Sequence, residues 1–138
     1  MAQFIEFITN HLVLAGCWLI TLLAIVVYHR RIGGQAVGSQ QAVMMINRQD
    51  ALVLDIRDKK EFETGHVTQA INMPLINLNK RMVELKKHQD KPIVVVCKMG
   101  QQSGEAVRTL KDNGYQQVYK LAGGIAEWKA QSLPLVQK

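Results

Sequence analysis

The chain has 138 residues, enough for one ordinary domain and a small additional segment. Its formal net charge of +6 is scattered, and aromatic residues make up only 6%, so its composition argues against a nucleic-acid partner. Two cysteines, Cys17 and Cys97, cannot form a disulfide framework, and Cys17 lies in an apolar stretch where a bridge to Cys97 is implausible. The four histidines are far apart and lack neighbouring ligands, so we expect no metal site.

An uncharged segment, Leu12 to Tyr28, follows the N-terminus. Extended back to Ile8, it would form a helix of about 30 Å, enough to cross the hydrocarbon core of a membrane. A cleaved signal peptide is the main alternative, but residues 1–10 contain no lysine or arginine and the apolar run is long for such a peptide. A soluble core helix is the third possibility, and apolar residues all round the helix argue against an edge position. We therefore expect an N-terminal segment, 1–31, with a transmembrane helix over about 8–28.

Basic residues flank this helix on its C-terminal side only, at Arg30 and Arg31. The positive-inside rule then predicts a single-pass protein of the inner (cytoplasmic) membrane. Its N-terminus lies outside, the rest of the chain is cytoplasmic, and the lipid bilayer is a partner. Residues 32–38 contain three glycines and no charge, so we expect a flexible tether there, with Val37 as a possible start of a short strand.

Strand and helix patterns alternate over residues 39–138, which we expect to form one α/β domain with a parallel sheet flanked by helices on both faces. Ser39 is the expected N-cap of a first helix, and Asp58 with Glu61 fits a capping box before another. The expected strands are 51–55, 70–72, 93–96 and 117–121, and the expected helices cover 40–48, 58–64 and 79–87. A further helix is expected after the loop 98–102, with Ala106, Val107 and Leu110 on one face and Gly114 as its stop, and Gly123 and Gly124 begin the last one.

Cys97 stands between a buried strand and a helix. Residues 93–96 are an uninterrupted β-branched run, typical of a central strand, and a loop over 98–102 leads into the helix. Open α/β sheets bind ligands at the carboxyl ends of their strands. The helix N-terminus, the backbone N–H groups of the loop and the charge of Lys98 would favour a reactive thiolate. The alternative is that Cys97 is a small buried hydrophobe, because free cysteine is among the most buried residues.

Three separated segments resemble the rhodanese (sulfurtransferase) family, and with the apolar N-terminal helix the chain resembles its single-domain, membrane-anchored bacterial type. DIRDKKEFETGHVTQAINMPL, Asp55 to Leu75, is similar to the family's D-x-R…E-F…G-H-I…A-x-N-x-P signature. CKMGQQS, Cys97 to Ser103, is similar to its cysteine loop, and LAGGIAEWKAQSLPL, Leu121 to Leu135, to its closing G-G-x-x-x-W…P segment. The order and the distances fit, and together they cover most of the chain after residue 38.

This resemblance implies a sulfurtransferase that carries sulfur as a persulfide on Cys97. The implied partners are a small sulfane-sulfur donor such as thiosulfate with a thiol or cyanide acceptor, or a protein persulfide. The substrate-binding residues would be the loop residues Lys98, Met99, Gly100, Gln101, Gln102 and Ser103. The resemblance implies no metal or organic cofactor. It makes Asp55 and Arg57 structural supports and His66 a structural residue in a turn.

Two loop positions depart from the common C-R-x-G-x-R-S pattern. Lys98 and Gln102 replace the arginines, so the loop loses one charge and the bidentate geometry of both, which predicts weak thiosulfate turnover. The alternative function is therefore a rhodanese-fold binding or scaffold module with little activity. A cysteine phosphatase or arsenate reductase of the C-x5-R type is a third possibility, but Ser103 stands where that arginine belongs.

Overall fold

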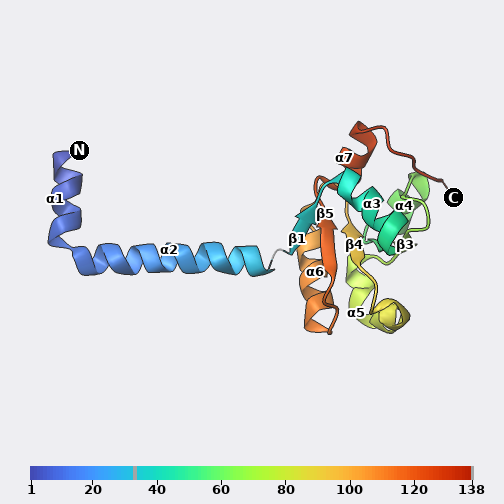
Figure 1. Cartoon of the computed structure of the whole chain (residues 1–138), viewed down its shortest axis with the longest axis horizontal. Helices are drawn as coiled ribbons and strands as arrows, with labels where there is room; N and C mark the ends of the chain where they lie inside the picture. The colour runs from blue at the N-terminus through green and yellow to red at the C-terminus, as the bar shows by residue number, and fades with distance from the viewer. Residues whose placement is uncertain (33, 138) are drawn as a thin grey trace. The chain divides into compact units, whose positions relative to one another are not determined.

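The computed structural model describes residues 1–32 and 34–137. The chain divides into two compact units, Met1–Ile32 and Gly33–Lys138 (Figure 1). Each unit has its own secondary structure, and we describe each by itself.

The N-terminal unit consists of two helices, α1 (Ala2–Asn10) and α2 (Leu12–Ile32). His11 separates them, because its backbone leaves the helical conformation (φ −128°, ψ 48°). The span Leu12–Arg31 is long and apolar enough to cross a membrane, and none of it is buried by other parts of the chain. A signal sequence near the N-terminus shares this length and composition. The expected helix over about 8–28 is wrong at its start, since residues 8–10 belong to α1.

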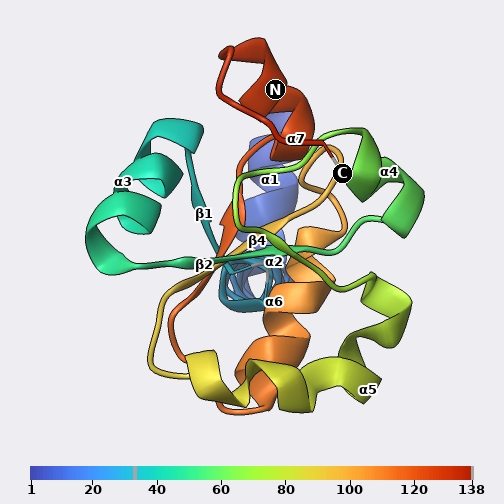
Figure 2. The same ribbon diagram turned by 90° about the vertical axis from the view of Figure 1, so that its right-hand side faces the viewer.

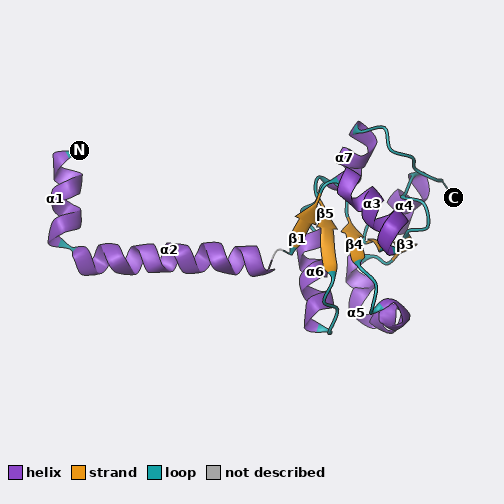
Figure 3. Ribbon diagram, in the orientation of Figure 1, coloured by secondary structure: helices purple, strands orange, loops and turns teal. Residues whose placement is uncertain are grey.

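The second unit is built on a five-stranded sheet in the order β1-β5-β4-β2-β3, and all strand pairs are parallel. Figure 3 shows the strands in orange among the helices of this unit. This confirms the α/β class. The strands are β1 (Gln35–Val37), β2 (Leu52–Asp55), β3 (Ile71–Asn72), β4 (Ile93–Val96) and β5 (Val118–Leu121). The α-helices are α3 (Ser39–Gln49), α4 (Lys59–Thr64), α5 (Leu78–Arg81), α6 (Ser103–Asp112) and α7 (Gly124–Ala130), and the 3-10 helices are η1 (Leu75–Asn77) and η2 (Met82–His88).

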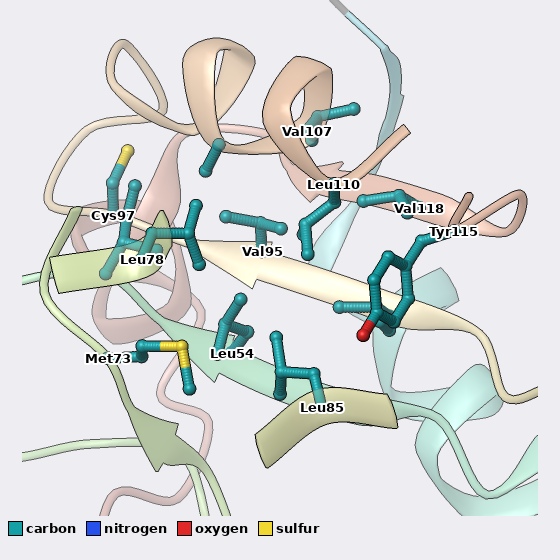
Figure 4. Packing of buried hydrophobic residues seen from close by; sticks show 13 residues of the cluster. Leu54, Met73, Leu78, Leu85, Val95, Cys97, Val107, Leu110, Tyr115 and Val118 are labelled. Atoms are coloured by element: carbon teal, nitrogen blue, oxygen red, sulfur yellow. The ribbon is translucent and has the colours of Figure 1, made fainter. Parts of the chain in front are cut away.

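Strand β4 is buried on both faces, as its β-branched run predicts. Ile93 and Val95 pack into one hydrophobic cluster with residues of α6 and with Leu78 and Leu85 (Figure 4). Val94 and Val96 pack into a second cluster with residues of α3 and α7. Figure 2 shows the same division, with α3 and α7 on one side of the strands and α5 and α6 on the other. Two faces covered in this way place β4 at the centre of the domain.

The expected tether over 32–38 is corrected by the structure. Gln35–Val37 is β1, which pairs in register with β5 from Gln35 opposite Tyr119 to Val37 opposite Leu121. Val37 is buried, so burial of its side chain and a ladder of backbone hydrogen bonds hold this strand in the sheet. Gly33 lies outside the described residues. The domain therefore starts before the expected residue 39.

Three local expectations also differ from the structure. The N-cap of α3 is Gly38, and Ser39 is the first helical residue. Asp58 is the N-cap of α4, but it makes no side-chain capping bond, so the expected capping box with Glu61 is absent. The expected helix over 79–87 is a short α-helix followed by a 3-10 helix, and the buried side chains of Leu78 and Leu85 hold this segment against the sheet.

Candidate active site

Cys97 is the first residue after β4, at the carboxyl end of the central strand. Its side chain is 2% exposed and belongs to the hydrophobic cluster beneath α6 (Figure 4). Cys97 is therefore both a buried core residue, as one interpretation of the sequence has it, and part of a cavity lining, as a reactive thiol would be.

The loop after Cys97 folds back on the sulfur atom. The backbone N–H of Gly100 donates a hydrogen bond to Sγ of Cys97 at 2.9 Å. The hydroxyl of Ser103, which is fully buried, lies 3.3 Å from the same Sγ and donates to the carbonyl oxygen of Gly100 at 3.2 Å. A thiol can donate its proton to this hydroxyl, and a thiolate can instead accept the hydroxyl proton. The pair therefore accommodates both protonation states of the sulfur.

Helix α7 supports this loop through its first backbone N–H groups. Ile125 N–H donates to the carbonyl oxygen of Cys97 at 2.9 Å, and Ala126 N–H donates to that of Lys98 at 3.1 Å. Gly100 has a φ of +90°, and a Cβ on it would lie 3.2 Å from the backbone nitrogen of Gly123. The sequence predicts only that the glycine pair starts a helix. Its contact with the cysteine loop depends on bringing the two segments together.

A cavity of about 380 Å³ opens over Cys97. Four of the expected substrate-binding residues line it, namely Lys98, Met99, Gln101 and Gln102. The other two, Gly100 and Ser103, contact Sγ instead. The rest of the lining comes from the segments after β2 and β3: Ile56, Arg57, Asp58, Glu61, Pro74, Leu75 and Ile76. None of these was expected to line the cavity from the sequence, and Arg57 was expected only as a structural support. The residues after β2 could have been expected at the cavity, because β2 and β4 are parallel neighbours and their carboxyl ends meet at one edge of the sheet.

Asp55 and Arg57 form a buried ion pair, as expected of structural supports. Arg57 Nη2 lies 2.7 Å from Oδ2 of Asp55, and Nε lies 3.0 Å from Oδ1. The same guanidinium donates to the carbonyl oxygen of Gly65 at 2.8 Å, which ties the end of α4 to the end of β2. Asn72 donates to the backbone carbonyls of both residues of the pair. The charge of Arg57 is thus neutralised inside the protein although the residue reaches the cavity.

The charge of Lys98 is also paired. Its Nζ lies 3.7 Å from Oε1 of Glu61, and both side chains are partly accessible to solvent. From the sequence, Lys98 was expected to assist a bound anion, and its acidic partner was not expected. Glu61 is oriented toward the cavity because it sits in the first turn of α4, which follows the carboxyl end of β2.

His66 is structural, and it is absent from the cavity lining. It stacks on Phe62 with 3.7 Å between ring centroids, and its Nδ1 lies 2.8 Å from the carbonyl oxygen of that residue. An antiparallel bridge joins His66 to Val136 and fastens the C-terminal segment. Among residues 1–32 and 34–137, no group of three or more histidine, cysteine or acidic side chains is arranged to hold a metal ion.

Residues 39–131 match the family model of the rhodanese-like domain. The chain belongs to the rhodanese-like family. It is 33% identical to the uncharacterized protein YibN of Escherichia coli K12 over 99% of both chains. It is 31% identical to the thiosulfate sulfurtransferase GlpE of Pseudoalteromonas translucida, over 65% of this chain and 84% of that one.

Solved rhodanese structures agree with this assignment. A rhodanese-related protein from Thermoplasma volcanium superposes with a TM-score of 0.66 at 28% identity, covering 75% of this chain and 99% of that one. A thiosulfate sulfurtransferase from Pseudomonas aeruginosa gives a TM-score of 0.67 at 25% identity, covering 75% of this chain and 20% of that one. These solved structures confirm the expected rhodanese-like fold.

Proposed function

We propose that this protein is a sulfurtransferase that carries sulfane sulfur as a persulfide on Cys97. The observation that carries the proposal is the hydrogen bond from Gly100 N–H to Sγ, with Ser103 beside it, at the base of a cavity. A backbone N–H aimed at sulfur stabilises a thiolate and, after transfer, the negative persulfide. The similarity to a thiosulfate sulfurtransferase over most of the domain supports the same chemistry.

The reaction has two balanced steps. The Cys97 thiolate attacks the outer sulfur of thiosulfate, the S–S bond of the donor breaks, and sulfite leaves with the electron pair of that bond. The resulting persulfide on Cys97 then gives its outer sulfur to a thiol or cyanide, and the Cys97 thiolate returns. Splitting the transfer in this way is covalent catalysis. Cys97 returns to its original oxidation state at the end of the second step, and neither step needs a cofactor.

Intact-protein mass spectrometry tests this proposal. The full-length chain in detergent, incubated with thiosulfate, should gain the mass of one sulfur atom and lose it again on addition of cyanide. Cys97→Ser should gain none. Cys17→Ser is the matched control and should behave as wild type, because Cys17 lies in α2. If wild type gains no sulfur from thiosulfate or from a cysteine persulfide, the sulfurtransferase proposal is wrong.

A binding or scaffold module with little activity is the second candidate. Two observations favour it: Gln102 brings no charge to the cavity, and Lys98 is paired with Glu61. A rhodanese-like domain with an intact cysteine would then present the cavity as a docking site. Absence of any persulfide on Cys97 in the experiment above would select this alternative.

We also propose that α2 anchors the protein in the inner membrane with its N-terminus outside. The support is its apolar length and the basic residues Arg30 and Arg31 in its last turn. In spheroplasts, protease added outside should leave the domain intact, and detergent should make it sensitive. Digestion of the domain without detergent would show that the domain lies outside, which is the opposite orientation. A mature chain shortened by the length of α1 and α2 would show a cleaved signal sequence.

A further inference from the structure

The charges around the Cys97 cavity come close to cancelling. The charged residues that line it are Arg57, Lys98, Asp58 and Glu61. Arg57 is held by the buried carboxylate of Asp55, and Lys98 by Glu61. Asp58 adds a negative charge at the start of α4. Each lining cation therefore has an acidic partner, and the two positive and two negative lining residues leave no surplus positive charge to attract a small anion.

This balance matters for the choice of sulfur donor. Attack on thiosulfate brings a dianion against a thiolate, so three negative charges gather in one cavity. Gln101 and Gln102 offer neutral amides there, and charge-assisted hydrogen bonds are about twice as strong as neutral ones. A persulfide, R–S–SH, brings less charge, and its thiolate leaving group carries one negative charge where sulfite carries two.

The rim of the cavity is apolar and accessible. Ile76 is 85% exposed and Met99 is 61% exposed, and both line the cavity. Leu75 and Pro74 extend this apolar part of the lining. Such a rim suits the carbon skeleton of a thiol carrier, and it offers nothing to the oxygen atoms of thiosulfate.

We propose that Glu61 is a specificity-determining residue that, by neutralising Lys98, selects persulfide donors over small oxyanion donors. This inference rests on the proposed function of Cys97. The favoured step is attack of the Cys97 thiolate on the outer sulfur of R–S–SH. The S–S bond of the donor breaks, a new S–S bond forms on Cys97 and the proton stays on the transferred sulfur. R–S⁻ departs with the electron pair, so atoms, charge and electrons balance.

A chemical probe tests the charge argument without any sulfur transfer. Iodoacetate and iodoacetamide alkylate the same thiol, but only iodoacetate is an anion. The rates at Cys97 are followed by mass spectrometry of its peptide in the full-length chain, which separates them from alkylation of Cys17. Glu61→Gln should raise the iodoacetate-to-iodoacetamide rate ratio about two- to fivefold at low salt, the range expected of an exposed ion pair. The increase should disappear near 1 M salt, where screening is nearly complete.

Glu63→Gln is the matched control. Glu63 lies on the same helix and pairs with Lys59 at 4.0 Å, but it does not line the cavity. This variant should leave the rate ratio unchanged. An unchanged ratio in Glu61→Gln, or an equal change in both variants, would overturn the role of Glu61.

Donor kinetics then test the selection itself. Glu61→Gln should raise kcat/KM for thiosulfate about two- to fivefold, and by a larger factor than kcat/KM for cysteine persulfide, because thiosulfate brings more negative charge. An equal increase for both donors would show that Glu61 does not discriminate between them, and would overturn the proposal. A shifted alkylation ratio with no persulfide from either donor would instead refute the proposed function, while the effect of Glu61 on the cavity charge would stand.

Discussion

Gly124 lies directly against Cys97 across the fold. A Cβ placed on Gly124 would collide with the carbonyl oxygen of Cys97 and come within 2.9 Å of the backbone nitrogen of Gly100, whose N–H is bonded to the sulfur. Gly124 also has a φ of +58°, a conformation that side chains rarely adopt. The start of α7 at Gly124 therefore helps to fix the position of Cys97, the candidate nucleophile.

Gly124→Ala should impair the site more than any surface glycine substitution. The collision is with backbone, which cannot move aside without displacing the cysteine loop, so we expect a loss of about 1–3 kcal/mol in the free energy of unfolding. Persulfide formation on Cys97 should also fall. Gly38→Ala is the control, because nothing lies within 4 Å of its added Cβ and its φ is −70°. Urea denaturation of a fragment from residue 34 onward measures the first effect, and equal stability of both variants would contradict the prediction.

Breaking the Asp55–Arg57 pair should be strongly destabilising. Both residues are almost fully buried, so Asp55→Ala leaves the guanidinium without its partner inside the protein. We expect a cost of about 3–5 kcal/mol in the free energy of unfolding. Glu63→Gln removes an exposed pair on α4 and should cost less than about 1 kcal/mol. Similar denaturation midpoints for the two variants would show that the buried pair contributes little.

The stability of the domain should fall as pH drops below about 6.5 because of His88. Burial lowers the pKa of His88 from its ordinary value of 6.5, and the charges of Lys87 and Lys91 add to the effect. The unfolded chain then binds a proton more readily than the folded one, so protonation favours unfolding over the window from 6.5 downward. Lys91 lowers the pKa of Asp50 from its ordinary value of 3.8, so that group loses its contribution only at more acidic pH.

His88→Gln tests this assignment. The side chain of the variant at this position does not titrate in that window. As pH falls from about 7.5 to about 5, the unfolding free energy of wild type should therefore decrease relative to that of the variant. Urea denaturation at several pH values measures it. A pH-independent difference would exclude His88 as the source.

Gln102→Arg should raise kcat/KM for thiosulfate by roughly tenfold. Gln102 lines the cavity, and an arginine there would replace a neutral hydrogen bond by a charge-assisted one, a gain of about 1.4 kcal/mol. Lys98→Ala should lower the same constant, more steeply at low salt, because Lys98 is exposed and its field is screened by ions. Steady-state assays with one acceptor at one pH compare the variants. Fast turnover by wild type with no gain in Gln102→Arg would show that the backbone of the loop suffices.

The sequence by itself determined the class of the domain and the place of Cys97, the candidate nucleophile, after a central strand. The β-branched run before Cys97 predicts a strand buried on both faces, and the structure places Ile93 and Val95 in one cluster and Val94 and Val96 in the other. Such predictions succeed because the periodicity of apolar residues is a local property of the chain. The D-x-R pair was likewise recognisable, since its two residues lie only two positions apart.

Only the tertiary structure decided what surrounds the sulfur. Gln35–Val37 looks like a glycine-flanked tether until β5, more than eighty residues later, supplies its hydrogen-bond partners. Glu61 fits a capping pattern in the sequence, but in the fold it meets Lys98 because β2 and β4 end at the same edge of the sheet. The contact of Gly124 with Cys97 has the same origin. Long-range contacts of this kind depend on which strands lie side by side, and no local pattern of residues encodes that choice.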